Sequence, residues 1–545
     1  MFSIDQNCHV LWDCVPKLQA LAAAGHAVTH FVEDVDVAFT ALGSTVDDTV
    51  LHLTRERFHR SGGQDWGAAL FYAEFLGKLP VEIRHWEPLT GMKTATVARH
   101  LGWTVDELYE EFSPGDTWQL IGSSYIGDRD HHRVIGDLSV AETLDFLFEL
   151  FHKARDDMFR AFPGEAARQR LARWFCAQEG LLAELVEAHR NAGLADLYHA
   201  WLESSVPAER VRVDRGSSLC AVGADADRAA LLDVFTRDYR RAAGLYNQAI
   251  EQTDADVRPL STEDGELPFF GIQPFQGHLV RTAAYLDDGR VRFGREAVAL
   301  DEAGRLPPQA LREAGIQCLA AKALLLVAQA RIGEAGQPLA LPYRGSLYMP
   351  TAHRLVARLD EAGLLPAPLQ PLVRVRFRLL DRMRELDTVV HLPEHLQAAM
   401  GRSEVPASEL GESHAELAQE AARRLERLGD DAARQAWQEE QFPRLTARID
   451  ELDSTRREMA QRNCTPEEMH ALWEQEKGLR RQLLERTVRQ IALDWQLREL
   501  DYWDSRGALL PWSIALGGED FYDRLIAEAD IYEEQPQPQG AAAGR

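Results

Sequence analysis

The chain has 545 residues, of which 45% are hydrophobic, and its 60 basic and 86 acidic residues give a formal net charge of −26. A chain of this length is too long to fold around one ordinary hydrophobic core, so we expect two or three globular domains. Because a strongly acidic chain gains nothing from counterion release, and its arginines are interleaved with Glu and Asp, nucleic acid is excluded as the main partner.

The sequence indicates neither a membrane protein nor a secreted protein. The N-terminal residues MFSIDQNCHVLW have no cationic stretch before an apolar one, unlike a signal peptide. The most apolar window, LAAKALLLVAQA, is too short to span a bilayer and contains Lys322. The six cysteines lack the spacing of a disulfide framework. We therefore expect a reduced, cytoplasmic protein.

The first forty residues read as a strand, a helix and a strand. We expect a short strand over His9–Trp12, then a helix with Pro16 in its first turn and Gly25 at its C-terminal cap. The apolar run Ala27–Val32 is typical of a buried strand. A short helix between two such strands predicts a right-handed parallel crossover in an α/β sheet.

Apolar runs alternate with helical periods up to about residue 380. The runs include VEIRHW, WQLIGSSYI, LPFFGIQ and LALPYRGSLYM. Two segments have the apolar spacing of amphipathic helices, residues 141–162 and residues 166–193. The pattern predicts an α/β core over residues 1–400, with helical insertions at about residues 140–255.

From about residue 408 the composition becomes rich in Glu, Arg, Gln, Ala and Leu. Apolar residues recur in a stripe formed by Leu472, Leu479, Leu483, Val488 and Ile491. We expect two or three long helices that form an antiparallel coiled-coil arm over residues 401–505. The stripe either pairs two copies of the chain into a homodimer or packs only within its own hairpin. The composition of residues 533–545 is that of a disordered tail.

Two groups of residues have some of the spacing of metal sites. Cys8, Cys14, His26 and His30 resemble a zinc finger, but the cysteine gap is too wide and the histidines fall on a predicted strand. Core cysteines and strand histidines explain them more simply. The loop GDRDHHR over residues 127–133 offers carboxylates and adjacent histidines, and a solvated polar loop is its simpler interpretation. We predict no metal site.

The sequence contains no standard nucleotide or nucleophile motif. Neither GxxxxGK[ST] nor GxGxxG occurs, and no GxSxG elbow is present. The sequence therefore identifies no cofactor.

Three carboxylates follow the predicted strand over Ala27–Val32 and form the best candidate site. Glu33, Asp34 and Asp36 lie where the strand ends, which is the edge at which α/β sheets hold ligands. Carboxylates there can bind an amine, fix hydroxyls or act as a general base. They can equally cap the N-terminus of a helix, and the spacing alone favours neither alternative.

The order of these features resembles the cysteine-adding enzyme of bacillithiol biosynthesis and its relatives over most of the chain. Ile4-Asp5-Gln6-Asn7 stands where that family has a motif close to TGQQ. Glu33-Asp34-Val35-Asp36 stands where its strand ends in E-D-H-D, with Val35 in place of histidine. The segment DDGRVRFGREAVALDEAGRLPPQALREAGIQCLAAKALLLVAQARIG is similar in pattern to a family segment that joins an apolar strand to a helix. Arg344-Gly345-Ser346 begins the segment that corresponds to the glycine-rich family element.

The resemblance implies a Rossmann-like core, a connecting segment, a dimerising coiled coil, and a C-terminal segment over residues 506–532 that packs back on the core. It implies an enzyme that joins an amino acid to the amine of a small molecule, with Glu33, Asp34 and Asp36 as catalytic residues. Substrate contacts would come from Gln6, Asn7, Arg344, Gly345 and Ser346. The alternative is a non-catalytic scaffold that keeps the fold and binds a partner through its helical arm.

Overall fold

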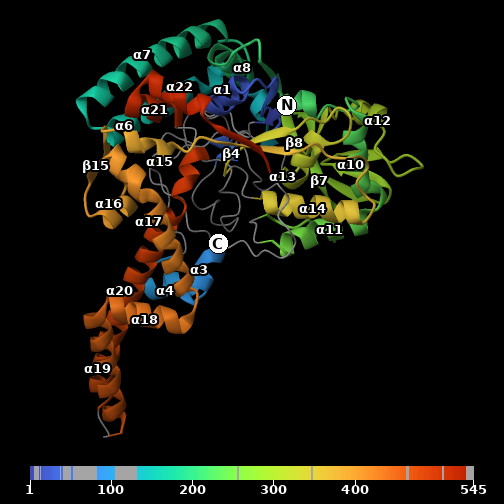
Figure 1. The fold of residues 1–545 in the computed structure, drawn as a ribbon. Helices are drawn as coiled ribbons and strands as arrows, with labels where there is room; N and C mark the ends of the chain where they lie inside the picture. The colour runs from blue at the N-terminus through green and yellow to red at the C-terminus, as the bar shows by residue number, and fades with distance from the viewer. Residues whose placement is uncertain are drawn as a thin grey trace. The chain divides into compact units, whose positions relative to one another are not determined.

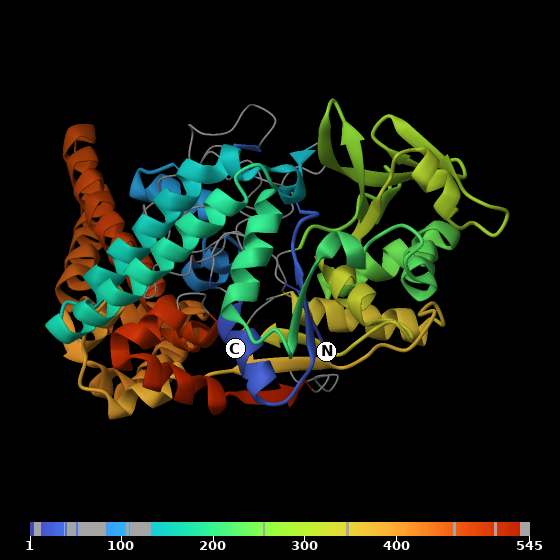
Figure 2. The same ribbon diagram turned by 90° about the horizontal axis from the view of Figure 1, so that it is seen from above.

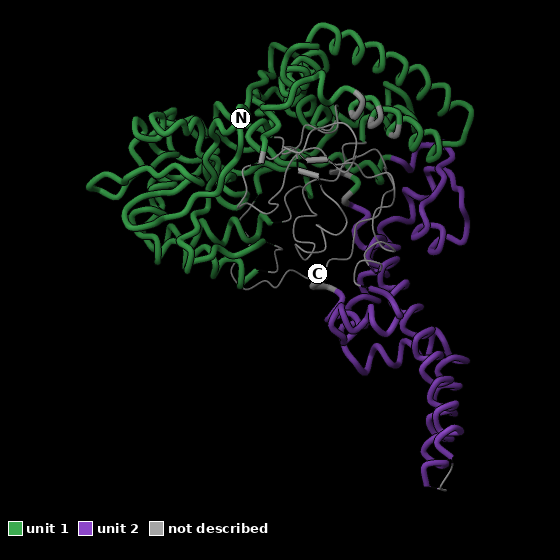
Figure 3. Tube along the Cα trace, turned by 180° about the vertical axis from the view of Figure 1, so that it is seen from behind, with its two compact units in different colours: residues 1–75, 117–382, 502–544 green, residues 76–116, 383–501, 545 purple. Residues whose placement is uncertain are grey.

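A computed structural model of the chain (Figure 1) describes residues 1–4, 12, 14–36, 39–40, 51–52, 83–104, 108, 132–253, 257–344, 348–461, 465–505 and 509–534. The chain forms two compact units (Figure 3). The first unit comprises residues 1–75, 117–382 and 502–544, and the second comprises residues 76–116, 383–501 and 545. The second unit therefore draws on two separate stretches of sequence.

The first unit contains a six-stranded sheet in the order β16-β13-β12-β1-β2-β6. Its strands are β1 (Phe2–Ile4), β2 (Val28–Val32), β6 (Val211–Arg215), β12 (Leu339–Pro342), β13 (Leu372–Arg376) and β16 (Asp530–Glu533). Neighbours from β13 to β6 are parallel, and β16 is antiparallel to β13. Because β2 and β6 extend the sheet on one side of β1 while β12 and β13 extend it on the other, the direction of winding reverses at β1.

The predicted parallel crossover is present, but its first strand lies earlier than expected. β1 is Phe2–Ile4 and pairs with β2, Ser3 lying beside His30. Of the segment His9–Trp12, residues 9–11 lie outside the described residues, and Trp12 is buried in the turn before the helix. A three-residue strand is too short to show an alternating pattern, so the sequence did not reveal it.

The crossover helix α1 (Val15–Ala23) begins and ends as its sequence predicts. Pro16 lies in the first turn, where its missing N–H costs no hydrogen bond. At the other end Gly25 has a φ of +86° and its N–H donates to the Ala22 carbonyl at 2.9 Å. The N–H of His26 donates to the Leu21 carbonyl at 3.0 Å, which completes a Schellman motif. The chain is thereby turned directly into β2.

A second, antiparallel sheet in the first unit was not part of the predicted fold. Its order is β10-β9-β8-β7-β11, with β5 beside β8. The strands are β5 (His132–Arg133), β7 (Glu266–Phe275), β8 (His278–Asp287), β9 (Arg290–Phe293), β10 (Glu296–Ala299) and β11 (Cys318–Ala321). Two-residue turns at Gln276-Gly277 and Asp288-Gly289, both with positive φ, join β7 to β8 and β8 to β9. Such turns match the twist of a hairpin.

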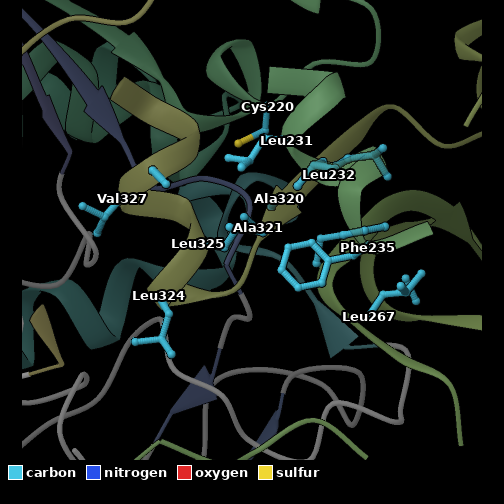
Figure 4. Packing of buried hydrophobic residues seen from close by; sticks show 14 of the residues in the cluster. Cys220, Leu231, Leu232, Phe235, Leu267, Ala320, Ala321, Leu324, Leu325 and Val327 are labelled. Carbon is cyan, nitrogen blue, oxygen red and sulfur yellow. The ribbon is translucent and has the colours of Figure 1, made fainter. Parts of the chain in front are cut away.

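One hydrophobic core joins the two sheets. It includes Phe31 of β2, Phe269 of β7, Leu319 of β11 and Leu339 of β12. Figure 4 shows part of this cluster around Leu324 and Leu325, both fully buried. Burying one such side chain stabilises the fold by roughly 1.5–3 kcal/mol. The end of β2 is therefore held between two sheets rather than on a free edge.

Helices cover the sheets of the first unit, as Figures 1 and 2 show. They are α6 (Val140–Ala161), α7 (Glu165–Ala188), α8 (Leu194–Ser205), α9 (Gly216–Leu219), α10 (Ala226–Arg237), α11 (Tyr239–Glu251), α12 (Pro308–Glu313), α13 (Ala323–Arg331), α14 (Met349–Glu361), α15 (Leu379–Arg382), α21 (Leu509–Gly517) and α22 (Glu519–Ala527), together with the 3-10 turn η2 (Ile135–Asp137). The strands β3 (Phe39–Thr40) and β4 (Leu51–His52) pair with each other. The two long helices predicted over residues 141–162 and 166–193 are present as α6 and α7, although α7 ends at Ala188 rather than at the glycine predicted to end it.

The C-terminal segment is part of the first unit and packs there against α7 and β13. Arg170 of α7 donates to the carbonyls of Ile514, Ala515 and Leu516 at 3.1, 2.6 and 3.1 Å, at the end of α21. Past α22 the chain returns to the sheet as β16. Residues 535–545, most of the predicted tail, lie outside the described residues.

The second unit is built mainly of helices. They are α3 (Ile83–Thr90), α4 (Thr94–Leu101), α16 (Glu394–Met400), α17 (Ala407–Leu428), α18 (Asp431–Gln441), α19 (Pro443–Ala460) and α20 (Pro466–Arg498), together with the 3-10 turn η3 (Met383–Glu385) and the strand pair β14 (Val389–His391) and β15 (Glu404–Pro406). A further 3-10 turn, η4 (Leu500–Ser505), follows α20 and contains the boundary at which the chain returns to the first unit. Long helices fill the region in which the sequence predicted them, and α19 and α20 pack side by side. A core that includes Trp86, Leu101, Trp437 and Val488 joins α3 and α4 to α18 and α20.

In the part of the chain that the structure describes, no helix is both long enough and apolar enough to cross a membrane.

Candidate functional site

The three predicted carboxylates lie directly past the end of β2, as expected. Glu33 and Asp34 are each 5% exposed, and Asp36 is partly buried. The backbone of this turn is fixed by the N–H groups of Gly136 and Ile135, which donate to the carbonyls of Asp34 and Asp36 at 2.8 and 2.9 Å. A Cβ at Gly136 would lie only 2.9 Å from the Asp34 carbonyl oxygen, so the close approach requires glycine. The carboxylates are thus on a rigid segment.

Asp34 binds the start of α9, which follows β6, the strand beside β2. Its Oδ1 accepts the backbone N–H of Ser217 at 2.7 Å, and its Oδ2 accepts the Ser217 hydroxyl at 2.5 Å. The side chain of Arg215, at the N-cap position of α9, makes no capping hydrogen bond, so Asp34 supplies this acceptor from a distant segment. Gly216 allows the approach, since a Cβ there would lie 3.3 Å from Oδ1.

The environment of Asp34 favours its protonated form more than water does. Burial raises the pKa of Asp34 above its ordinary value, although the two hydrogen bonds from Ser217 and the charge of Arg215 act in the opposite direction. A carboxylate whose pKa is raised takes a proton more readily at neutral pH than an exposed one. Asp34 therefore combines a fixed geometry with increased basicity.

Asp36 forms an ion pair with Arg281 of β8. The Arg281 guanidinium also lies over the ring of Phe270, with 4.2 Å from its Cζ to the ring centroid. Lys322, which follows β11, has its Nζ 5.2 Å from the same centroid and 2.6 Å from Glu266 Oε1. Arg281 of the antiparallel sheet thus neutralises Asp36, and this ion pair ties the end of the parallel sheet to the second sheet.

The surroundings of Glu33 and Asp34 keep two nearby cysteines protonated. Burial, followed by the charge of Glu33, the neighbouring Cys318 and the charge of Asp34, raises the pKa of the Cys220 thiol well above its ordinary value. Burial and the charge of Asp34 raise the pKa of Cys318 to about 12. The Cys318 Sγ donates to the Ser217 carbonyl at 3.3 Å. Neither thiol is therefore an activated nucleophile.

Arg344 lies at the same edge of the sheet as Asp34. It follows β12 by two residues, as Asp34 follows β2, and these two strands flank β1 in a parallel arrangement. Strands two places apart in a sheet are separated by about 10 Å. The neighbouring Tyr343 has the guanidinium of Arg376 over its ring, 4.1 Å from Cζ to the centroid. The other predicted contacts, Gln6, Asn7, Gly345 and Ser346, lie outside the described residues.

Of the residues that resemble a zinc finger, Cys14, His26 and His30 are described, and these three do not form a metal-binding group. Cys14 is buried before α1, Cys8 lies outside the described residues, and His30 is fully buried with its Nδ1 hydrogen bonded to Ser3 Oγ at 3.0 Å. Burial, and next the charges of Lys17 and His199, lower the pKa of His30 well below its ordinary value. Across the described ranges no three His, Cys, Asp or Glu side chains form a metal-binding group.

The loop over residues 127–133 is described only at its end. His132 and Arg133 form the short strand β5, and residues 127–131 lie outside the described residues. Arg133 donates to Asp137 Oδ2 at 2.5 Å and to Glu142 Oε1 at 3.0 Å. Arg133 therefore belongs to an ion-pair network rather than to a metal site.

Sequence reasoning missed the partners of the carboxylates. Ser217 lies in VRVDRGSS, where a short alternating strand runs directly into Gly-Ser-Ser, and that strand-to-helix turn was the only local signal. Nothing near Arg281 in sequence connects it with Asp36.

No protein-family model matches the chain, and no curated protein matches its sequence.

Proposed function

We propose that the chain is a cytoplasmic, divergent amino-acid-ligase-like enzyme, which joins an amino acid to the amine of a small molecule. The observation that carries this proposal is the position of the carboxylates at the sheet edge beside the strand at which the winding reverses. In doubly wound α/β folds this edge holds the ligand. The order β6-β2-β1-β12-β13 also supports a Rossmann-like core, since it follows the order 3-2-1-4-5.

The described residues of the site each have a role that their surroundings allow. Asp34 takes a proton from the substrate ammonium, which its raised pKa favours, and the neutral amine then attacks. Asp36, neutralised by Arg281, and the buried Glu33 hold the turn and the local charge. Arg344 binds the carboxylate or phosphate of the activated amino acid, while Gly345 and Ser346 supply backbone N–H groups. Gln6 and Asn7 hydrogen bond to the acceptor.

The reaction requires an activated carboxyl group, because an amine does not displace hydroxide from a free acid at a useful rate. The acyl carbon forms a bond to the amine nitrogen and loses its leaving group, and the ammonium proton passes to Asp34. The donor is therefore an acyl phosphate, acyl adenylate or thioester.

The test is an assay for amide formation. Amino acids with ATP, and amino-acid thioesters, are each incubated with the chain and an amino sugar, and the amide product is detected by mass spectrometry. We expect Asp34→Asn to lower the rate by about 100-fold or more, the usual contribution of a general base. Asp214→Asn is the matched control, since Asp214 is the carboxylate on the adjacent strand. The absence of product with every pair, together with no thermal shift by nucleotides, amino acids or amino sugars, would contradict the proposal.

A second candidate function is that of a non-catalytic scaffold whose helical arm binds a partner, and the surface of α20 favours it. Trp473 of α20 is 43% exposed, an unusual state for so large an apolar side chain. His470 stacks on its ring, and Lys477 Nζ lies 4.7 Å from the ring centroid. We propose that α17 to α20 form a coiled-coil arm through which two copies associate.

Light scattering tests the arm separately from catalysis. We expect a dimer at micromolar concentration and a shift toward monomer for Trp473→Ala. The matched control is Glu474→Ala, an exposed residue of the same helix. A wild-type chain that is monomeric at these concentrations would contradict association through the arm.

A further inference from the structure

Two adjacent serines at the end of β6 each donate a hydrogen bond to an aspartate. The Ser217 hydroxyl donates to Asp34 Oδ2 at 2.5 Å, and the Ser218 hydroxyl donates to Asp214 Oδ1 at 2.8 Å. The two contacts are alike in chemistry and lie one residue apart. Their environments differ, and that difference separates a reactive serine from an ordinary one.

We propose that Ser217 and Asp34 are a nucleophile and its general base, and that Ser217 accepts an acyl group from an activated acyl donor. Ser217 lies directly past the carboxyl end of β6 and Asp34 past that of β2, and the two strands are parallel neighbours. Ser217 is half-buried, whereas Asp34 is 5% exposed. Ser217 is thus accessible in part, while the Asp34 carboxylate that it contacts is shielded from water. A base within hydrogen-bond reach of a serine hydroxyl can activate it as a nucleophile, and here a carboxylate takes the place that a histidine more often has.

Hydrogen bonds to the backbone fix the positions of Ser217 and Asp34 relative to each other. Asp34 Oδ1 accepts the Ser217 N–H at 2.7 Å, and the Asp34 carbonyl accepts the Gly136 N–H at 2.8 Å. Both residues are thus fixed at main chain and side chain. A base must lie within hydrogen-bond reach of the proton it removes, and this geometry keeps Oδ2 on the hydroxyl.

Ser218 lacks these features. Its hydroxyl also donates to the Arg215 carbonyl at 2.7 Å, and it is exposed. Although burial acts to raise the pKa of Asp214, hydrogen bonds from Arg212, the Arg215 N–H and Ser218 lower it below its ordinary value. Burial instead raises the pKa of Asp34. Asp34 is therefore the stronger base, and the chain contains its own control.

The acyl transfer balances without a further reagent. The Ser217 oxygen forms a bond to the acyl carbon, the bond to the leaving group breaks, and the hydroxyl proton passes to Asp34 and then to the leaving group. An amine or water next attacks the ester carbon and loses its proton through Asp34, and Ser217 regains its hydroxyl. This inference rests on the same carboxylate as the proposed function, but water can replace the amine.

The probe is an aryl fluorophosphonate, which reacts with activated serines. The Ser217 oxygen forms a bond to phosphorus, fluoride leaves, and Asp34 takes the proton. Labelled protein is digested and the modified residue is located by mass spectrometry. We expect modification of Ser217 and not of Ser218, loss of the adduct in Ser217→Ala, and no change in Ser218→Ala. In Asp34→Asn the labelling rate should fall by about 100-fold or more.

The pH dependence of labelling provides a second readout. The rate should fall as the pH drops through the pKa of Asp34, because the protonated carboxyl accepts no proton. Groups that face Asp34 are the Arg215 cation, the adjacent Glu33 carboxylate, and the thiols of Cys220 and Cys318. The raised pKa values of both thiols keep them neutral over this range, so the thiols do not cause the expected fall in the labelling rate.

Several outcomes would overturn the inference. An unmodified Ser217 in the folded wild-type chain, or equal modification of Ser217 and Ser218, would identify the Asp34 contact as a helix cap alone. The wild-type comparison decides the question even if Asp34→Asn does not fold, which its melting curve would show. Modified Ser217 without amide product would contradict the proposed function and leave the pair intact. Amide formation by Ser217→Ala at the wild-type rate would contradict the role of Ser217 as a nucleophile and leave the proposed function intact.

Discussion

Glu266 in the antiparallel sheet of the first unit and Glu476 in the α19–α20 hairpin of the second are both buried, at 1% and 5% exposure. Each contacts two cations. Glu266 Oε1 lies 2.6 Å from Lys322 Nζ and 2.6 Å from Arg258, whereas Glu476 lies 3.0 Å from Arg456 and 2.8 Å from Arg480. The chain thus buries one ion-paired carboxylate in a sheet and another between two helices.

The difference between them lies in the partners. The side chain of Lys322 is 4% exposed, while those of Arg456 and Arg480 are 36% and 57% exposed. A buried charge that loses its partner stays in a low-dielectric environment, whereas an exposed one is hydrated. The contribution of a buried ion pair to stability therefore depends on whether the remaining partner can reach water.

The largest expected effect comes from removing the Glu266 carboxylate. Glu266→Leu leaves Lys322 buried, and we expect a loss of about 3–5 kcal/mol in the free energy of unfolding, measured by urea denaturation. The double variant Glu266→Leu/Lys322→Met should recover most of this loss, since the buried cation is then removed and the other partner, Arg258, has a side chain that is 33% exposed and can be hydrated.

The exposed Glu263 provides the matched control for this position. Glu263→Leu should change stability by no more than about 0.5 kcal/mol. A loss in the double variant as large as in Glu266→Leu would show that packing, rather than the buried charge, is responsible.

How far the sequence could predict this structure depends on whether a feature is determined by neighbouring residues or by tertiary contacts. The first crossover, the cap at Gly25 and the helices α6 and α7 were predictable because a helical period or a cap lies within a few residues of sequence. β1 is too short for that signal. The antiparallel sheet has turn signals such as Asp288-Gly289, but its place against the parallel sheet depends on tertiary contacts.

The candidate site was predictable only in part. The charge at the end of β2 and its position at the sheet edge follow from local pattern. Its partners do not, since Ser217 lies 183 residues and Arg281 lies 245 residues from the aspartates they contact. Asp34 does accept the N–H of Ser217 at the start of α9, but α9 is not a helix that follows β2, and the role of Asp34 as a base stays a prediction. No local spacing can encode such a contact.

A smaller effect is expected when the charge of Glu266 is removed but its shape is kept. Burial acts to raise the pKa of Glu266, yet Lys322, the Ser261 N–H and Arg258 outweigh it and lower the pKa below the ordinary value. The ionised form therefore stabilises the fold fully above the unfolded-state pKa of about 4.3, and this stability is lost as the pH falls through the lowered folded-state pKa.

Urea denaturation of Glu266→Gln between pH 7 and pH 3 measures this dependence. We expect a difference from the wild type of about 2 kcal/mol at pH 7, as for hydrogen bonds to charged groups, which shrinks below pH of about 4.3. A difference that stays constant to pH 3 would mean that the charge of Glu266 contributes nothing. The sign is opposite for Asp34, whose pKa is raised, because acidification through that window favours the folded state.

The smallest effect is expected at Glu476. Glu476→Leu leaves Arg456, which keeps a contact of 2.9 Å with Asp453, and Arg480, which is more than half exposed. Both cations can be hydrated without moving the helices, and leucine adds apolar contact at a buried position of the hairpin. We expect a change in the free energy of unfolding within about 1 kcal/mol of zero, in either direction. Glu474→Leu, at an exposed position two residues earlier, measures the effect of leucine alone. A loss at Glu476 as large as that at Glu266 would mean that partner exposure does not set the cost, and that Glu476 instead fixes the register of α19 against α20.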